Sequence, residues 1–326
     1  MIGKAQKIAN TELKAFFRTR GLVHDNKALQ VKSFGYKAKH NLFLVSLGNN
    51  VFLLKFLLDL NYSKDQITEL MLKARLSGVI PEFYFSGESV GVSYLLLEYV
   101  DGKPKDQFTQ SELEQFVEAL HRLHAIEVSS EDISRWGQNK PQTYYMGKKH
   151  QSLEPKLPPH INDVVENAIT NLKDLEVEVP TYSILHGDLQ YPNVLFTNQG
   201  VRFIDLDDIT VGDPAYDLME SYVHLNLDPD QKVTLLKSYQ KKTADEGLVG
   251  RAITYERFKY LTWYLWGLEK QLMVLNQEPN HFLAQDFNHL VRIETEEPLR
   301  RCVRLGVVSK LQLDRSYFDL RKKRLG

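Results

Sequence analysis

The first third of the chain alternates short apolar runs with polar turns, a pattern that predicts strands. Gly48-Asn49-Asn50 is a strong hairpin-turn signal between two of these runs. A helix is expected over residues 10–20, and a second over Ser63–Leu76, with Ser63 as N-cap and an apolar stripe on one face. The expected strands are Ala28–Ser33, Leu42–Leu47, Val51–Phe56, Glu82–Ser86 and Ser93–Val100.

Beyond residue 101 the apolar spacing is mainly that of helices. One helix is predicted over Ser111–Ile126, with Ser111 as its cap, and another over Ile161–Leu175. Residues from about 128 to 160 have no strong period, which predicts a loop or short helices. The segment Ser183–Asp208 has short apolar runs between turn residues, and we expect a small β-insert there.

A strand-rich region followed by a helical one indicates an α+β fold, because strands and helices do not alternate as in βαβ units. The turn cluster Asp101-Gly102-Lys103-Pro104 ends the last strand of the first region. We therefore expect an N-lobe of residues 1–101, a β-sheet with one helix, and a mainly helical C-lobe of residues 102–326.

Composition excludes several classes of protein. A formal net charge of −1 gives no electrostatic reason to expect nucleic acid or an anionic membrane as a partner. The apolar stretches are too short to span a bilayer, and no long apolar run follows the basic residues at the N-terminus. The single cysteine, Cys302, excludes an intrachain disulfide and fits a reducing compartment, so we expect a soluble, cytoplasmic protein.

The β-insert concentrates side chains that suit magnesium and phosphate chemistry. Carboxylate and amide oxygens are the ligands that Mg²⁺ prefers, and phosphoryl transfer also needs a carboxylate that orients the attacking hydroxyl. Asp205 follows directly after the apolar strand Val201–Ile204, whose burial would fix its position. Asp188 and Asn193 belong to one loop, so their side chains can face the same point. The cluster is His186, Asp188, Asn193, Asp205, Asp207 and Asp208.

Lys55 is the candidate phosphate-binding lysine, because it interrupts the apolar run Leu53–Leu57. Such a lysine is costly to bury without an anionic partner. Glu69, on the following helix, is the expected partner, with Asp65 as a rival. The alternatives are a lysine that extends from an edge strand to solvent, and an exposed Glu69.

Three ordered motifs resemble the aminoglycoside phosphotransferase and choline kinase superfamily. His186–Asn193 matches its H-G-D-x-x-x-x-N motif, Ile204–Asp208 its metal-binding motif, and Gly212–Leu218 its G-D-P-x-x-D-L element. The resemblance implies a bilobal protein-kinase-like fold. It also implies an ATP- and Mg²⁺-dependent enzyme that moves the γ-phosphate of ATP to a hydroxyl of a small molecule.

Carried onto this chain, the resemblance gives roles to residues of the cluster. Asp188 would be the catalytic carboxylate, and Asn193 and Asp205 would hold Mg²⁺ on the nucleotide phosphates. His186 would be structural, and Asp217 would brace the catalytic loop.

The same resemblance extends to the nucleotide. Leu95–Gly102 resembles the strand and hinge that hold adenine, so backbone groups of Glu98 and Val100 would bond the base. Lys55, paired with Glu69, would contact the α and β phosphates.

The expected phosphate loop departs from the family pattern, because Gly35 is its one glycine. Lys37, Lys39 or His40 would then supply charge in place of backbone amides. This departure motivates an alternative hypothesis, a catalytically quiet kinase-like binding or structural protein.

Two features favour a small-molecule acceptor over a protein acceptor. A protein kinase has Arg between the His and Asp of its catalytic loop, where this chain has Gly187. The stretch from Asp205 to Gly212 is also too short for a peptide-docking activation loop. A protein kinase is therefore the disfavoured third hypothesis.

The acceptor itself stays open: an aminoglycoside, an amino alcohol, a sugar or a similar molecule. Asp207 and Asp208 either join the metal or substrate site or cap a turn. The further acidic residues would either attract a cationic acceptor or begin helices, and Trp263 and Trp266 either belong to the core or line a pocket through cation–π contacts. These further acidic residues are Asp213, Glu220 and Asp228.

Overall fold

The computed structural model describes residues 2–19, 29–37, 40–57, 63–137, 141–157, 159–177, 179–275 and 297–307. The chain forms two compact units. The first contains Met1–Glu127, His186–Thr210 and His224–Asn226, and the second contains the remainder.

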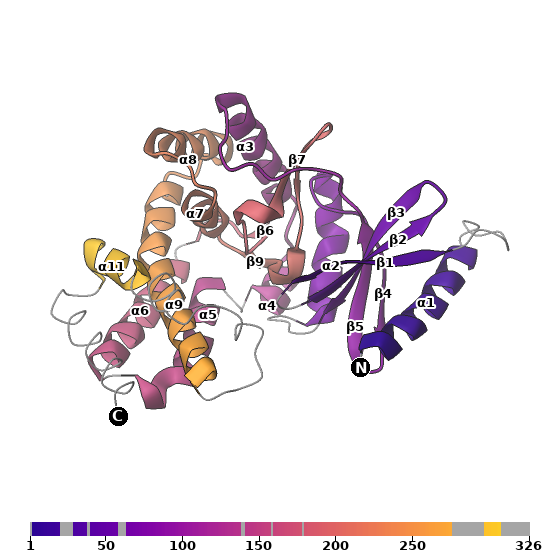
Figure 1. The fold of residues 1–326 in the computed structure, drawn as a ribbon. Helices are drawn as coiled ribbons and strands as arrows, with labels where there is room; N and C mark the ends of the chain where they lie inside the picture. The colour runs from indigo at the N-terminus through magenta and orange to yellow at the C-terminus, as the bar shows by residue number, and fades with distance from the viewer. Residues whose placement is uncertain are drawn as a thin grey trace. The chain divides into compact units, whose positions relative to one another are not determined.

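A five-stranded antiparallel sheet forms the centre of the first unit, with strand order β1-β2-β3-β5-β4 (Figure 1). The predicted turn joins β2 to β3, where Leu47 pairs with Asn50 and Gly48 adopts a φ of 60°. The strands are β1 (Gln30–Lys37), β2 (His40–Leu47), β3 (Asn50–Leu57), β4 (Phe83–Ser89) and β5 (Val92–Glu98).

Helix α1 (Ile2–Thr19) covers one face of this sheet, and it begins earlier than the helix predicted from residue 10. Leu13 and Phe17 of α1 are fully buried in a core that includes Phe43, Leu54 and Tyr94. Because side chains alternate along a strand, Lys55 points to the face opposite Leu54. The sheet therefore has the buried Lys55 on the face opposite the apolar core that α1 covers.

Two helices of the first unit show how local sequence sets a helix start. Helix α2 (Lys64–Ala74), followed by the 3₁₀ turn η1 (Arg75–Ser77), begins at Ser63 as predicted, and the Ser63 hydroxyl accepts from Gln66 N–H. Helix α3 (Gln110–His124) is capped by Thr109, so the prediction of Ser111 was wrong. Glu112 decides this, because its carboxylate accepts from Thr109 N–H at 2.8 Å and completes a capping box.

The predicted β-insert is present. Its hairpin contains β7 (Val194–Thr197) and β8 (Gly200–Phe203), between the 3₁₀ turns η3 (Tyr191–Asn193) and η4 (Leu206–Asp208). The two short strands β6 (Ser183–Leu185) and β9 (Thr210–Gly212) pair with each other. Phe203 at the end of β8 packs edge-on against Phe116 of α3, with ring centroids 5.8 Å apart. This contact fixes the strand that leads to Asp205.

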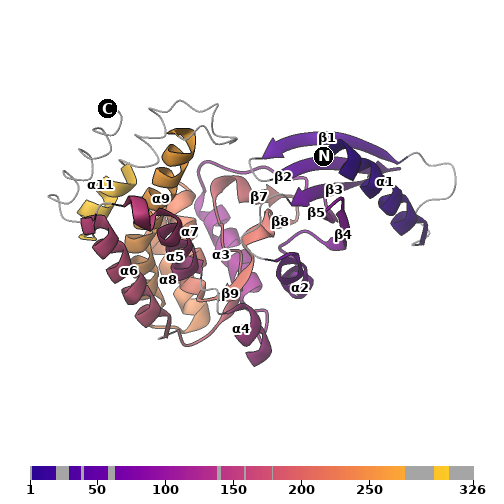
Figure 2. The ribbon, with the colours of Figure 1, turned by 90° about the horizontal axis from the view of Figure 1, so that it is seen from below.

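The second unit is helical, and α5 and α11 pack on the long helix α9 (Figure 2). Short helices, rather than a loop, occupy most of the segment without a clear period. Among the described residues, no helix is both long and apolar enough to cross a membrane. The α+β fold class is confirmed. The helices are α4 (Ser130–Trp136), α5 (Pro141–Leu153), the 3₁₀ turn η2 (Glu154–Lys156), α6 (Pro159–Val177), α7 (Pro214–His224), α8 (Pro229–Thr243), α9 (Leu248–Leu275) and α11 (Glu297–Arg304).

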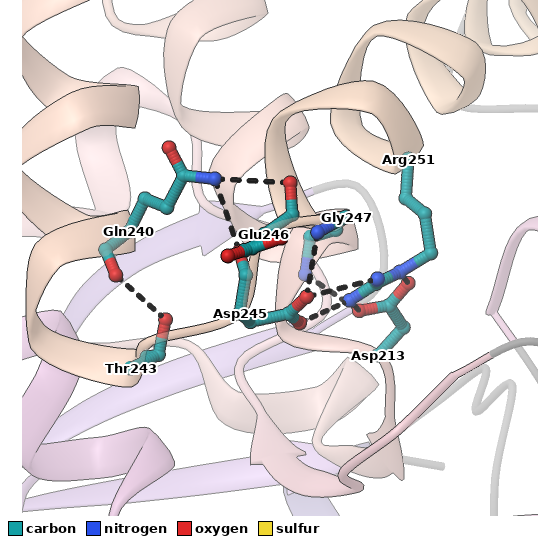
Figure 3. Close-up of polar contacts among 8 residues, drawn as sticks. Asp213, Gln240, Thr243, Asp245, Glu246, Gly247 and Arg251 are labelled. Carbon is teal, nitrogen blue, oxygen red and sulfur yellow. Dashed lines mark hydrogen bonds and ion pairs between the residues drawn. The ribbon is translucent and has the colours of Figure 1, made fainter.

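A buried arginine ties three parts of the second unit together (Figure 3). Arg251 of α9 donates to Asp213 through Nε at 2.7 Å and Nη2 at 3.1 Å, and Nη2 also donates to Asp245 Oδ2 at 2.6 Å. Asp213 in turn accepts from Ala215 N–H in the first turn of α7. One guanidinium thus joins α9, the α8–α9 turn and the start of α7.

Asp213 and Asp228 both act at helix starts, one of the two alternatives left by the sequence. Asp228 caps α8 by accepting from Gln231 N–H at 2.8 Å. Glu220, the third acidic residue in question, is fully buried and ion-paired with Lys259 at 2.6 Å.

We predict that Arg251→Ala lowers the free energy of unfolding by about 3–5 kcal/mol, because it leaves two acidic partners without their buried cation. Urea unfolding at neutral pH measures this loss. The control is Arg257→Ala, an exposed arginine on the same helix, for which we expect a change within about 0.5 kcal/mol. Equal losses of unfolding free energy in Arg251→Ala and Arg257→Ala would show that the buried ion pairs of Arg251 do not stabilise the fold.

A pH prediction follows from Asp245. The hydrogen bond from Arg251 lowers the pKa of Asp245 below its ordinary value of 3.8. A lowered carboxyl pKa adds stability that is complete above the ordinary value and is lost as the pH falls through the folded-state pKa. The stability difference between wild type and Asp245→Asn should therefore be constant from neutral pH to about 5 and shrink toward pH 3. A stability difference that grows as the pH falls would show that folding does not lower the pKa of Asp245.

Candidate active site

The loop between β6 and β7 is held by His186, which is fully buried. Its Nδ1 accepts from Asp188 N–H at 3.2 Å, and its Nε2 lies 3.0 Å from the Ile204 carbonyl oxygen. These partners require a neutral ring with its proton on Nε2. The imidazole therefore joins the loop to the end of β8, as a structural residue would.

Gly187 has a backbone conformation that explains why the loop has glycine at this position. Its φ is +82°, and a Cβ atom there would lie 2.2 Å from the carbonyl oxygen of Asp208. No side chain fits without moving η4. The loop of Asp188 and the acidic turn are thus in direct backbone proximity.

The carboxylate of Asp188 is oriented by two amide donors. Gln190 Nε2 donates to Asp188 Oδ2 at 2.7 Å, and Asn193 Nδ2 donates to the same oxygen at 3.1 Å. Gln190 was not among the residues predicted to act at the site. Its place two residues after the predicted catalytic carboxylate was the available signal.

Asn193 connects this loop to the residue that follows β8. Its Nδ2 also donates to the Asp188 carbonyl at 3.0 Å, and its own carbonyl accepts from Ile204 N–H at 2.9 Å. Both side-chain hydrogen bonds described for Asn193 use Nδ2, so Oδ1 can serve as a metal ligand.

Asp205 follows β8 in the left-handed region, with φ 69° and ψ 56°. This conformation is uncommon for a residue with a Cβ atom and is often found at functional sites. It turns the chain into η4, which places Asp207 beside Asp205. Lys55 Nζ forms ion pairs with both, to Asp205 Oδ1 and, at 2.6 Å, to Asp207 Oδ1.

Asp205 and Asp207 keep the buried side chain of Lys55 protonated. The lysine is 3% exposed. Burial alone would lower the pKa of its ammonium group, but the carboxylates of Asp207 and Asp205 outweigh burial and raise the pKa above its ordinary value. Lys55 therefore stays protonated at neutral pH. It is a buried lysine, not one that extends to solvent.

The structure pairs Lys55 with Asp205 and Asp207 rather than with Glu69, the partner expected from the sequence. Glu69 lies half-buried on α2. Two carboxylates stabilise a buried ammonium group more than one does. A Lys55–Glu69 pair stays a prediction for the nucleotide-bound protein. Asp207 accordingly pairs with a lysine, and its expected roles at a metal or substrate site or as a turn cap stay predictions.

The expected adenine-binding segment follows β5. Glu98 is half-buried, and its N–H donates to the Glu82 carbonyl at 2.9 Å. Its bond to a base stays a prediction. Val100 is half-buried two residues later. Lys39 and the side chains of Lys37 and His40 lie outside the described residues.

Two further predictions concern the second unit. Asp217 is fully buried on α7, and its bracing role stays a prediction. Trp263 stacks on Tyr260 with ring centroids 6.3 Å apart, and both Trp263 and Trp266 are half-buried. This exposure fits both a place in the core and a place in the wall of a pocket.

The part of the chain that the structure describes contains no group of three or more His, Cys, Asp or Glu residues placed to hold a metal. A nucleotide-bound Mg²⁺ needs no such group, because phosphate oxygens and waters complete its octahedral shell. The donor set fits: Asn193 Oδ1 and Asp205 offer hard oxygens, and Asp205 already neutralises a cation, Lys55.

A family model described as the phosphotransferase enzyme family matches residues 63–252, more than half of the chain. The chain belongs to this family. The resemblance drawn from the three motifs is confirmed. A search of the curated proteins found no match.

Solved structures show the same fold. A choline/ethanolamine kinase family protein from Mesorhizobium loti is 19% identical, with a TM-score of 0.61 over 89% of this chain and 92% of that one. Choline kinase from Streptococcus pneumoniae is 15% identical, with a TM-score of 0.63 over 91% and 99%. Spectinomycin phosphotransferase, solved with ADP and spectinomycin, is 11% identical, with a TM-score of 0.57 over 86% and 93%. This confirms the predicted kinase-like fold of this phosphotransferase.

Gly187 and Gly200 offer a matched test of the loop geometry. Both have positive φ, but a Cβ at Gly200 meets nothing within 4 Å. Gly200→Ala therefore carries only the backbone strain, about 1 kcal/mol. We predict that Gly187→Ala destabilises the protein more than Gly200→Ala, measured by thermal unfolding, because it also displaces Asp208. Equal effects would show that the close approach to Asp208 is not a constraint.

Proposed function

We propose that this member of the phosphotransferase family is an ATP- and Mg²⁺-dependent small-molecule kinase that transfers the γ-phosphate of ATP to a hydroxyl. The observation that carries the proposal is the joining of Lys55, Asp205 and Asp207, with Asn193 linking this cluster to Asp188. A lysine, metal-ligand oxygens and an oriented carboxylate are the parts that phosphoryl transfer requires.

Asp188 is the group that orients the acceptor hydroxyl. Amide donors from Gln190 and Asn193 hold its Oδ2 and fix the plane of the carboxylate. As the bond between the acceptor oxygen and the γ-phosphorus forms, the bond from that phosphorus to the β–γ bridging oxygen breaks. The proton of the hydroxyl passes late to Asp188.

Asn193 and Asp205 would hold Mg²⁺ on the nucleotide phosphates. When bound, the ion would neutralise charge on the phosphates. Lys55 would then exchange a carboxylate oxygen for oxygens of the α and β phosphates, and Glu69 is the carboxylate expected to pair with it in that state. Backbone groups of Glu98 and Val100 would bond the adenine.

Similarity to solved structures supports the acceptor class. Solved structures with this fold include choline and ethanolamine kinases, and spectinomycin phosphotransferase was solved with spectinomycin and ADP. We propose an aminoglycoside, an amino alcohol, a sugar or a similar hydroxyl compound, in a cytoplasmic protein without a nucleic-acid partner. Gly187 supports a small acceptor, since its closeness to Asp208 excludes the arginine of protein kinases.

A catalytically quiet nucleotide-binding protein is the second candidate. The observation that favours it is the single glycine, Gly35, in the expected phosphate loop. A screen of ATP consumption against aminoglycosides, choline-like amines, sugars and hydroxy amino acids separates the two. Turnover with any acceptor establishes the kinase, whereas Mg·ATP binding without turnover supports the second candidate. No thermal stabilisation by millimolar Mg·ATP would overturn the proposal.

We predict different defects for the two carboxylates. Asp188→Asn should lower kcat by about 10²–10⁴-fold and leave Mg·ATP binding intact, because Asp188 acts on the acceptor. Asp205→Asn should abolish the part of ATP affinity that depends on Mg²⁺. Calorimetry with and without Mg²⁺, together with turnover of the acceptor that the screen finds, measures both.

The control for these variants is Asp230→Asn, an exposed aspartate in the first turn of α8, which should leave binding and turnover unchanged. Full turnover in Asp188→Asn would remove this residue from the mechanism. Mg²⁺-dependent ATP binding in Asp205→Asn would do the same for the metal assignment.

A further inference from the structure

Arg202 lies on β8, three residues before Asp205, and its side chain is 12% exposed. Its Nη2 donates to Glu98 Oε2 at 2.6 Å and to the Ile80 carbonyl at 2.7 Å. One guanidinium therefore joins the strand that leads to the metal ligand, the end of the strand that leads to the expected adenine site, and the segment before β4.

The segment Val79–Glu82 is also bonded to both of those strands through its backbone. Phe203 N–H of β8 donates to the Val79 carbonyl at 2.7 Å. At the other side, Glu98 N–H donates to the Glu82 carbonyl, and Glu82 N–H donates to Glu98 Oε2 at 3.0 Å. Arg202 and Glu98 close a ring of hydrogen bonds around three chain segments.

Burial constrains the hydrogen bonding of the Arg202 side chain. Its Nε is buried and has no hydrogen-bond partner among the described residues. A buried donor without a partner is destabilising, so the two contacts of Nη2 must offset that cost. Nη1 also donates to Glu98 Oε1 at 3.5 Å, so both terminal nitrogens of the guanidinium meet the Glu98 carboxylate, which the single ammonium group of a lysine cannot reproduce.

We propose that Arg202 is a positioning residue that couples the adenine end of the nucleotide site to its metal end. The inference rests on the proposed function. It acts through two covalent connections: the side chain of Glu98 fixes the backbone group assigned to adenine, and the backbone of β8 fixes Asp205. Breaking the ion pair would release both ends, although neither ligand group is altered.

The test is Arg202→Met, which keeps the length of the side chain and removes its hydrogen bonds. Calorimetry measures binding of adenosine alone, of ADP without metal, and of ADP with Mg²⁺. We expect adenosine to bind at least about fivefold more weakly, and the gain in ADP affinity from Mg²⁺ to fall by a similar factor. A residue that only stabilises the fold would lower the unfolding temperature and leave both ratios unchanged.

Glu98→Gln is the second variant, because it keeps the acceptor for Glu82 N–H and removes the charge that holds Arg202. It should show the same two losses, and the double variant should be no worse than either single one, since both remove one interaction. The control is Arg135→Met, from an exposed pair with Glu131 at 3.9 Å, which should bind all three ligands as wild type does.

The outcomes separate this inference from the proposed function. If either variant weakens adenosine binding and also lowers the gain in ADP affinity from Mg²⁺, the coupling is supported. If a folded variant changes only one of these two quantities, or neither, the coupling is overturned while the kinase proposal stands. Failure of the wild type to bind Mg·ADP would overturn the proposed function and this inference with it.

Discussion

The buried charge of Lys55 is the constraint on which the site depends. An ammonium group in the middle of an apolar strand is stable only beside carboxylates, because removing one partner of a buried pair costs about 3–5 kcal/mol. Asp205 and Asp207 supply them from positions 150 and 152 residues further along the chain. These ion pairs therefore join the acidic turn to the sheet and stabilise the arrangement of the candidate site.

Two backbone conformations make that assembly possible. Asp205 turns the chain in the left-handed region, and Gly187 allows the loop of Asp188 to approach the carbonyl of Asp208. His186 then joins the loop to β8 with both ring nitrogens. The local strain of a positive φ at an aspartate is compensated by the ion pair with Lys55, so backbone geometry and charge support each other.

The sequence predicts what local patterns determine. The order of strands and helices, the cap at Ser63 and the chemical character of His186–Asn193 follow from spacing within a few residues. The partner of Lys55 does not, because nearby Glu69 and distant Asp207 are equally acceptable by residue type. The cap of α3 shows the same limit at short range, since Thr109 and Ser111 differ only in which one Glu112 can reach. Arg202 carries no motif, and its contacts with Glu98 and Ile80 exist only in the folded unit.

The charges of the cluster also indicate how a nucleotide would bind. Lys55 contributes +1 and Asp205 and Asp207 contribute −1 each, so the three together carry −1. A polyphosphate alone would bring more negative charge to carboxylates that are already in excess of the lysine. In the proposed function, Asn193 and Asp205 would hold a divalent cation that offsets part of this charge, and Lys55 would then be able to pair with a phosphate. The ion pairs seen here are thus the arrangement that a magnesium–nucleotide complex would exchange, and free ATP would have to enter against them.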